Sequence, residues 1–185
     1  TLGLMNGWVL IVGIIAVSGA GWACFGMDLI AGLQKRWYEV LVFLGAGLVL
    51  LILRMAFLNG LDYPPYFDSM HHYLMADDIL HFNEVPHAYY RLNQYPVRYY
   101  HFGFHFLAAG VQAVTHQELH RVMLVLGQVL QTAAVLAVYY PGRIITKSRV
   151  GGWAAVLFAG FGWVMPAAAS SWGKYPAVFA AAGRL

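Results

Sequence analysis

The sequence predicts an all-α, polytopic integral membrane protein. Of its 185 residues, 61% are hydrophobic and 10% are charged, which is unlike the composition of a soluble domain of this length. The apolar runs are continuous rather than alternating, which favours helices over strands as the spanning elements. Because several runs reach the ~20 residues that a bilayer requires, we expect about four full transmembrane helices and a truncated one.

Charge and aromatic content point to lipid partners. The net charge of +3 is small and scattered, which argues against a nucleic-acid partner. The 6 Trp and 12 Tyr suit the aromatic belts at membrane interfaces.

The single cysteine, Cys24, cannot form an intrachain disulfide, so it does not indicate a redox compartment. No basic region precedes the first apolar run and the chain stops inside a new one, so we expect residues 1–185 to be one transmembrane domain of a longer protein.

Apolar runs and basic connections together predict the topology. Five runs precede a sixth that begins near Tyr175, and they cover Asn6–Met27, Trp37–Leu58, Tyr99–Thr115, Val122–Tyr140 and Val150–Ala169. Two connections, Gln34–Arg36 and Pro141–Arg149, are basic, and the positive-inside tendency places both on the cytoplasmic side. If all five runs crossed the membrane, these two basic connections would lie on opposite sides of it. We therefore expect the short run at 99–115 to be an interfacial or re-entrant helix.

Residues 59–121 then form one extracytoplasmic loop with juxtamembrane helices, in a protein of the plasma (inner) membrane. All 8 histidines lie in this segment. A turn at Asn59–Pro65 precedes a helix that opens at Asp68-Ser69, continues to about Phe82 and ends before Pro86. We expect this helix to lie along the membrane surface.

An acid and two imidazoles share one face of that helix. Asp68, His71 and His72 stand at i, i+3 and i+4, so their side chains are close neighbours. In simpler interpretations, Asp68 caps the helix and the histidines are interfacial residues with a polar edge in water. Asp77 and Asp78 most simply form the solvated face, although adjacent carboxylates can attract a divalent cation. The sequence identifies no other cofactor.

Two further histidine pairs have helical spacing. His101/His105 and His116/His120 are each four residues apart, so each pair could offer two imidazoles to one metal. A histidine-ligated membrane metal oxygenase is therefore an alternative. The His-x-x-His-His motif on which membrane desaturases and hydroxylases rely is absent.

The loop resembles a known class of enzyme. The segments Tyr66–Tyr73, Tyr95-Pro96 and Tyr100–Ala109 are similar to the amino-terminal part of GT-C class membrane glycosyltransferases, the protein mannosyltransferase and aminoarabinose transferase relatives. The resemblance covers roughly residues 40–176. In that class the first external loop carries an essential acid just beyond a transmembrane helix, and short helices that do not cross. Here Asp68 is followed by Ser69 rather than a second acid, and residues 170–176 contain no acid.

The resemblance implies transfer of a sugar from a polyprenyl-phosphate donor on the extracytoplasmic side. Asp68 would be the general base for the acceptor, and His71 or His72 would share or tune its proton. Cationic and donor groups would hold the phosphate and the substrate. The candidate substrate-binding residues are Asp62, Arg91, Arg98, His101, His105 and Lys174.

A second alternative is a non-catalytic helical subunit of a larger membrane complex. Small residues at Gly3 and Gly7, and the glycines and alanines of residues 151–169, allow close helix contact. Such contacts suit membrane-protein partners and an enzyme's own helices equally well.

Overall fold

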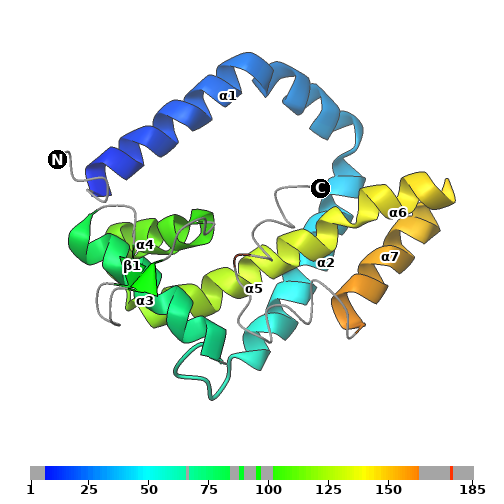
Figure 1. The fold of residues 1–185 in the computed structure, drawn as a ribbon. Coiled ribbons are helices and arrows are strands. Elements are labelled where there is room, and N and C mark those ends of the chain that lie inside the picture. Colours follow the sequence, from blue (N-terminus) through cyan, green and yellow to red (C-terminus); the bar gives the residue numbers. More distant parts are fainter. Residues whose placement is uncertain are drawn as a thin grey trace.

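The structure is a computed structural model that describes residues 7–65, 67–83, 88–89, 95–96, 102–162 and 176. It is helical apart from one pair of two-residue antiparallel strands, in which Ala88 faces Pro96 and Tyr89 faces Tyr95. The elements, all but β2 labelled in Figure 1, are α1 (Gly7–Lys35), α2 (Trp37–Phe57), α3 (Phe67–Phe82), β1 (Ala88–Tyr89), β2 (Tyr95–Pro96), α4 (Gly103–Thr115), α5 (Leu119–Ala137), α6 (Tyr139–Thr146) and α7 (Arg149–Phe161).

Two helices are long and apolar enough to cross a membrane. They are Trp37–Ala56 in α2, with 20 residues, and Leu119–Thr146, which joins α5 and α6 into 28 residues. The helix α1 has 29 residues, but the apolar stretch among its described residues is Ile15–Cys24, and α7 has only 13 residues. The described residues therefore contain two such helices, fewer than the four expected from the apolar runs.

The basic connection expected at Pro141–Arg149 is mostly helix, so its predicted extent is wrong. Pro141 is the third residue of α6, where a proline needs no hydrogen bond from its nitrogen. Lys147 ends α6 in the left-handed conformation, with φ 51°, and the Ser148 hydroxyl accepts a hydrogen bond from the Val150 amide to start α7. Only residues 147–148 separate the two helices.

The α6–α7 hairpin packs closely because small residues line it. A Cβ on Gly142 would lie 2.6 Å from the Ala155 Cβ, and one on Gly152 would lie 2.8 Å from the Tyr139 ring. The close helix contact predicted from the glycines after residue 150 is thus confirmed for this hairpin. Arg54 adds a polar link between α2 and α7, because its Nη2 donates to the Gly160 carbonyl at 3.1 Å.

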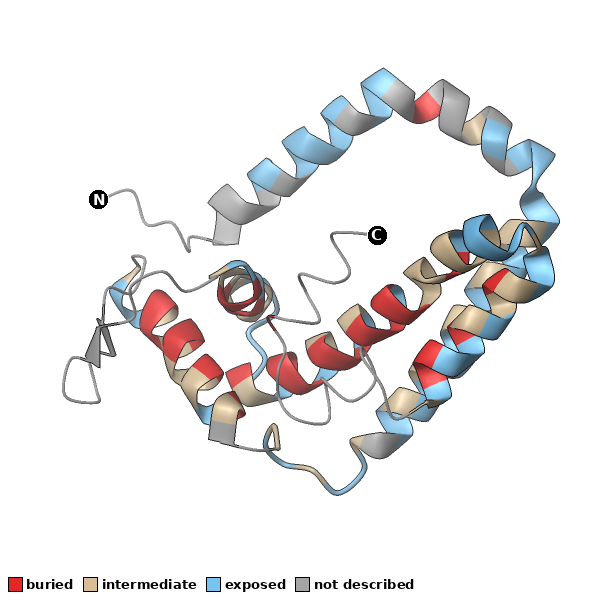
Figure 2. Ribbon diagram, turned by 45° about the vertical axis from the view of Figure 1, so that its right-hand side comes forward, coloured by how far each residue is buried: buried red, intermediate tan, exposed pale blue. Residues whose placement is uncertain are grey.

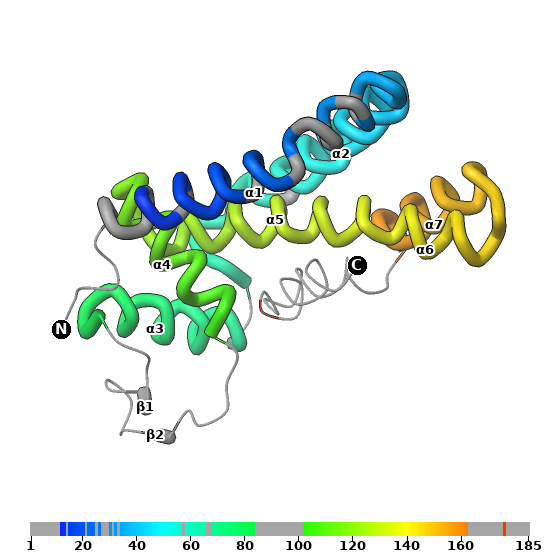
Figure 3. The backbone as a smooth tube through the Cα atoms, turned by 90° about the horizontal axis from the view of Figure 1, so that it is seen from above, coloured from blue at the N-terminus to red at the C-terminus, as the bar shows by residue number. Residues whose placement is uncertain are grey.

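Buried residues form two clusters joined by α5 (Figure 2). The first gathers α3, α4 and the start of α5 and consists of Ala76, Phe104, Ala108, Leu119 and Met123. The second gathers α2, α5, α6 and α7 and consists of Leu50, Val135, Tyr139, Val156 and Ala159. Figure 3 shows α5 running from the α3–α4 end of the molecule to the α6–α7 end.

Both helices between the two long ones are short. The expected helix at 68–82 is α3, which has 16 residues and begins one residue earlier, at Phe67. It ends at Asn83, whose left-handed φ of 59° breaks the helix. The run at 99–115 contains α4, whose 13 residues extend over about 20 Å. That is well below the ~30 Å of a bilayer core, in keeping with the expectation that this run does not cross.

Candidate functional site

The acid predicted as the base lies at the beginning of α3. Asp68 is half-buried in the first helical turn, where the positive end of the helix dipole favours a carboxylate. The turn is fixed by Ser69, whose hydroxyl donates to the Pro65 carbonyl. His71 and His72 follow on the same helix, so the predicted i, i+3, i+4 arrangement is confirmed.

His72 and His105 meet between α3 and α4. The His72 Nδ1 lies 3.1 Å from the His105 Nε2, and both side chains are buried. The Phe102 and Phe104 rings lie beside His105, each with its centroid 5.8 Å away. The interpretation of His72 as an interfacial residue with a polar edge in water is therefore wrong. This contact links a residue predicted as catalytic to one predicted as substrate-binding, and the sequence did not indicate that they touch.

The two adjacent acids of α3 have different surroundings. Asp78 is 2% exposed, so its assignment to a solvated face is wrong. The reason is that α3 contacts three elements, namely α4, α5 and β1. More than one face of the helix is therefore covered. Asp77 is partly exposed and its Oδ1 lies 3.3 Å from the Nδ1 of His81, an exposed residue one turn later.

His116 and His120 do not share a helix, so that predicted pair is wrong. His116 ends α4 in the left-handed conformation, with φ 56°, whereas His120 lies in the first turn of α5. The His120 Nε2 lies 3.3 Å from a Glu118 oxygen, and its ring centroid is 4.6 Å from that of Tyr63. In the described part of the chain, no group of three or more His, Cys, Asp or Glu side chains could hold a metal ion.

The remaining predicted substrate-binding residues are only partly described. Asp62 is exposed in the bend between α2 and α3. Arg91, Arg98, His101 and Lys174 lie outside the described residues. His105 is fully buried. The packing of α3 on α4 therefore brings His72 and His105 together, and Asp68 and His71 lie on the same helix as His72.

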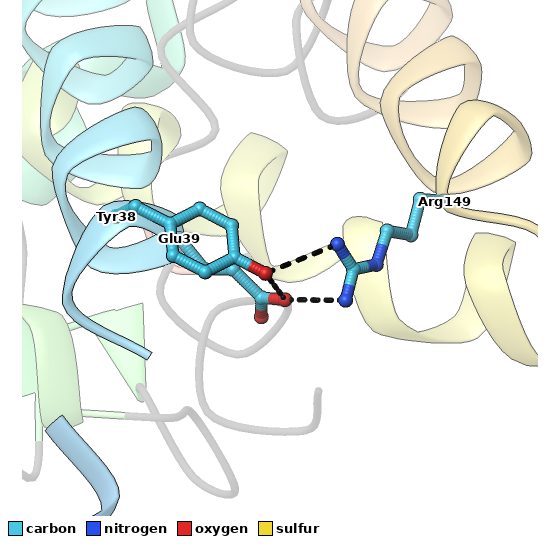
Figure 4. A network of polar contacts seen from close by, with 3 residues as sticks. All are labelled: Tyr38, Glu39 and Arg149. Atoms are coloured by element: carbon cyan, nitrogen blue, oxygen red, sulfur yellow. Dashed lines mark hydrogen bonds and ion pairs between the residues drawn. The ribbon is translucent and has the colours of Figure 1, made fainter. Parts of the chain in front are cut away.

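A second polar arrangement lies at the opposite end of the long helices, where α2 begins. The Arg149 Nη2 is 2.8 Å from the Glu39 Oε1, and the Arg149 Nη1 donates to the Tyr38 hydroxyl at 3.3 Å (Figure 4). The Tyr38 hydroxyl in turn donates to Glu39 Oε1 at 3.2 Å. The Tyr38 hydrogen bond, and next the Glu39 charge, raise the pKa of Arg149 above its usual value. The guanidinium of an arginine is charged at every physiological pH.

A cleft of about 100 Å³ adjoins this network, and aromatic and charged residues form its walls. Its lining residues are Tyr38, Glu39, Val42, Phe43, Tyr139, Arg149 and Trp153. The space is enough for several water molecules or one small chemical group. The sequence pattern did not predict this site. Its signal was Glu39, an acid near the start of an apolar run, because an ionised group in such a place needs a partner.

Comparison with known proteins gives no match to a family model, a curated protein or a solved structure. Two places in the described residues combine polar groups that could act on or bind a ligand. They are the start of α3 with Asp68 and the cleft beside Arg149.

Proposed function

We propose that α2 and the joined α5–α6 helix cross a membrane, with residues 59–118 on the extracytoplasmic side. Three observations support this. Both helices have sufficient length and apolar composition. Their chain directions are opposed (Figure 1), and α2 leads into the segment 59–118 while α5 leads out of it. Arg149 contacts Tyr38 and Glu39, so the connections with Lys35, Arg36 and Lys147 lie at one end, as the positive-inside tendency requires of a cytoplasmic side.

We further propose that the protein transfers a sugar from a polyprenyl-phosphate donor, with Asp68 as general base. The observation that carries this proposal is the position of Asp68, half-buried in the first turn of α3 and a short loop beyond the end of α2. A base at the membrane surface can take the proton of an acceptor hydroxyl or amine while the donor phosphate stays in the bilayer. The His72–His105 contact fixes α3 against α4, which holds the base in place.

The Asp68→Asn variant tests this proposal directly. The full-length protein would be reconstituted in liposomes with radiolabelled polyprenyl-phosphate mannose or polyprenyl-phosphate aminoarabinose and a membrane extract that supplies hydroxyl and amine acceptors, and transfer of the labelled sugar from the lipid to an acceptor would be followed. Loss of the base should lower turnover by about 10²- to 10⁴-fold with no loss of folded protein. Glu118→Gln is the matched control, because Glu118 is an exposed acid at the same end of the molecule. Equal turnover of Asp68→Asn and the parent protein would overturn the assignment.

One observation favours the alternative role as a helical subunit. Only 6% of the apolar stretch of α2 is buried within the chain, which leaves a wide face for lipid or for helices of another protein. Purification in a mild detergent distinguishes the two roles. A stoichiometric partner protein, together with no turnover of either donor, would favour the subunit.

A further inference from the structure

The cleft beside Arg149 combines one cation, one anion and several aromatic rings in a small space. Arg149 and Glu39 stand at 2.8 Å from each other, so the site has no net charge. We propose that it binds the headgroup of a zwitterionic phospholipid, of the ethanolamine or choline class. This assignment rests on the proposed crossing of the membrane by α2 and α5–α6, and it is independent of glycosyl transfer.

Arg149 is suited to the phosphate of such a headgroup. Its side chain is 57% exposed, and its guanidinium has more N–H donors than its contacts to Tyr38 and Glu39 use. Planar guanidinium groups bind phosphate oxygens through paired hydrogen bonds. The Tyr38 and Glu39 contacts hold the guanidinium at the edge of the cleft, so a phosphate would meet donors that are already oriented.

Glu39 and the aromatic rings are suited to the ammonium group. Both Glu39 contacts use Oε1, so Oε2 can accept a hydrogen bond or a charge contact from an amine. The Phe43 ring lies 4.7 Å from that of Tyr139 and 5.0 Å from that of Trp153, centroid to centroid. Rings in such clusters attract cations that approach their faces. The acid and the rings thus complement the positive end of the headgroup.

Apolar surface beside the cleft favours a lipid over a soluble zwitterion. Val42 lines the cleft and is also 52% exposed. From there exposed apolar side chains continue along α2, namely Leu41, Leu44, Leu48, Val49 and Ile52. The α6–α7 hairpin exposes Ile144 and Ile145 near the end of α6, and Val150, which follows Arg149 in the chain. A headgroup in the cleft would leave its acyl chains against this apolar surface, in the arrangement expected at a bilayer interface.

Lipid selectivity tests the proposal, and Glu39→Gln is the decisive variant. The full chain would be reconstituted in nanodiscs with equal amounts of phosphatidylethanolamine, phosphatidylcholine and phosphatidylglycerol, and the lipids retained after extraction into detergent would be measured by native mass spectrometry. The parent protein should retain zwitterionic lipid several-fold over phosphatidylglycerol. Glu39→Gln should reverse this preference, because the Arg149 charge then lacks its counter-charge. Arg149→Gln should abolish retention of both classes.

Lys147→Gln is the matched control, since it removes a positive charge from the same hairpin outside the cleft, and it should retain the parent preference. Glu39→Gln keeps the Tyr38–Arg149 contact, and its helical circular dichroism should equal that of the parent.

Retention that follows the nanodisc composition, or an unchanged preference in Glu39→Gln, would overturn the proposal. Displacement of the lipid by an equal concentration of soluble phosphoethanolamine would overturn the lipid assignment. Sugar transfer from polyprenyl-phosphate donors is a separate readout, so failure of either proposal is recognised independently.

Discussion

His72 and His105 form a buried contact because α3 and α4 each direct a histidine into the surface between them. A neutral imidazole has one donor and one acceptor nitrogen. The 3.1 Å separation of His72 Nδ1 and His105 Nε2 therefore requires one ring to donate to the other. This contact is stronger in a dry interior than in water. At the residue scale it is a polar link between α4 and the helix that carries Asp68.

We predict that this link can be measured as a coupling energy. His72→Ala and His105→Ala should each destabilise the protein by about 1–3 kcal/mol, because each removes one side of a buried hydrogen bond. The double variant should lose less unfolding free energy than the two single variants lose in sum, and the difference should be about 0.5–3 kcal/mol. Denaturant unfolding in mild detergent gives these values. His81→Ala, which removes an exposed histidine of the same helix, should change stability by less than about 1 kcal/mol. Strictly additive histidine variants would contradict the coupling.

At the element scale, the α6–α7 hairpin depends on glycines where helices come too close for a side chain. Gly152 lies against the Tyr139 ring, and Gly142 lies against Ala155. Tyr139 is buried and belongs to the cluster that joins α2, α5, α6 and α7. Displacement of this ring would therefore affect the hairpin and the wall of the cleft beside Arg149 together.

Gly152→Ala should destabilise the protein by about 1–3 kcal/mol, because the added methyl group overpacks a site with no free space. Its matched control is Gly45→Ala in α2, where nothing lies within 4 Å of the new Cβ. That change should stabilise the helix by about 0.5–1 kcal/mol, since alanine loses less backbone entropy than glycine. Thermal unfolding of both variants in detergent measures the difference. Equal changes in stability for Gly152→Ala and Gly45→Ala would refute close packing at Gly152.

Local signals in the sequence predicted some elements well. The acid at Asp68 and the spacing of apolar residues after it gave the bounds of α3 to within one residue. The basic connection before Arg149 was predicted too long, because a proline in the first turn of a helix is compatible with that helix. Four crossing helices were expected, and the described residues contain two helices that are both long and apolar enough to cross. Apolar composition alone does not reveal where a helix ends.

The contacts that build both candidate sites could not be predicted. Arg149 meets Tyr38 and Glu39 across more than a hundred residues of chain, and His72 meets His105 from another helix. The pattern of one sequence reports which residues share a face of one helix, but it does not report which helix packs against that face. The burial of Asp78 was missed for the same reason.

At the scale of the whole molecule, two long helices of opposite direction connect two chemically different ends. One end holds α3 and α4 with Asp68 and the buried histidines, and the other holds the α6–α7 hairpin with Arg149 at its turn (Figure 1). The proposed crossing of a membrane by α2 and α5–α6 would place these ends on opposite surfaces. Both functional proposals depend on that separation.

Cysteine labelling tests this separation most directly. In a Cys24→Ser background, Asn59→Cys would mark the loop after α2 and Lys147→Cys would mark the hairpin turn, both at exposed positions. Sealed right-side-out vesicles would be treated with a membrane-impermeant maleimide before and after permeabilisation. We predict labelling of Asn59→Cys in intact vesicles and of Lys147→Cys only after permeabilisation. Labelling of both positions in intact vesicles would contradict the two crossings.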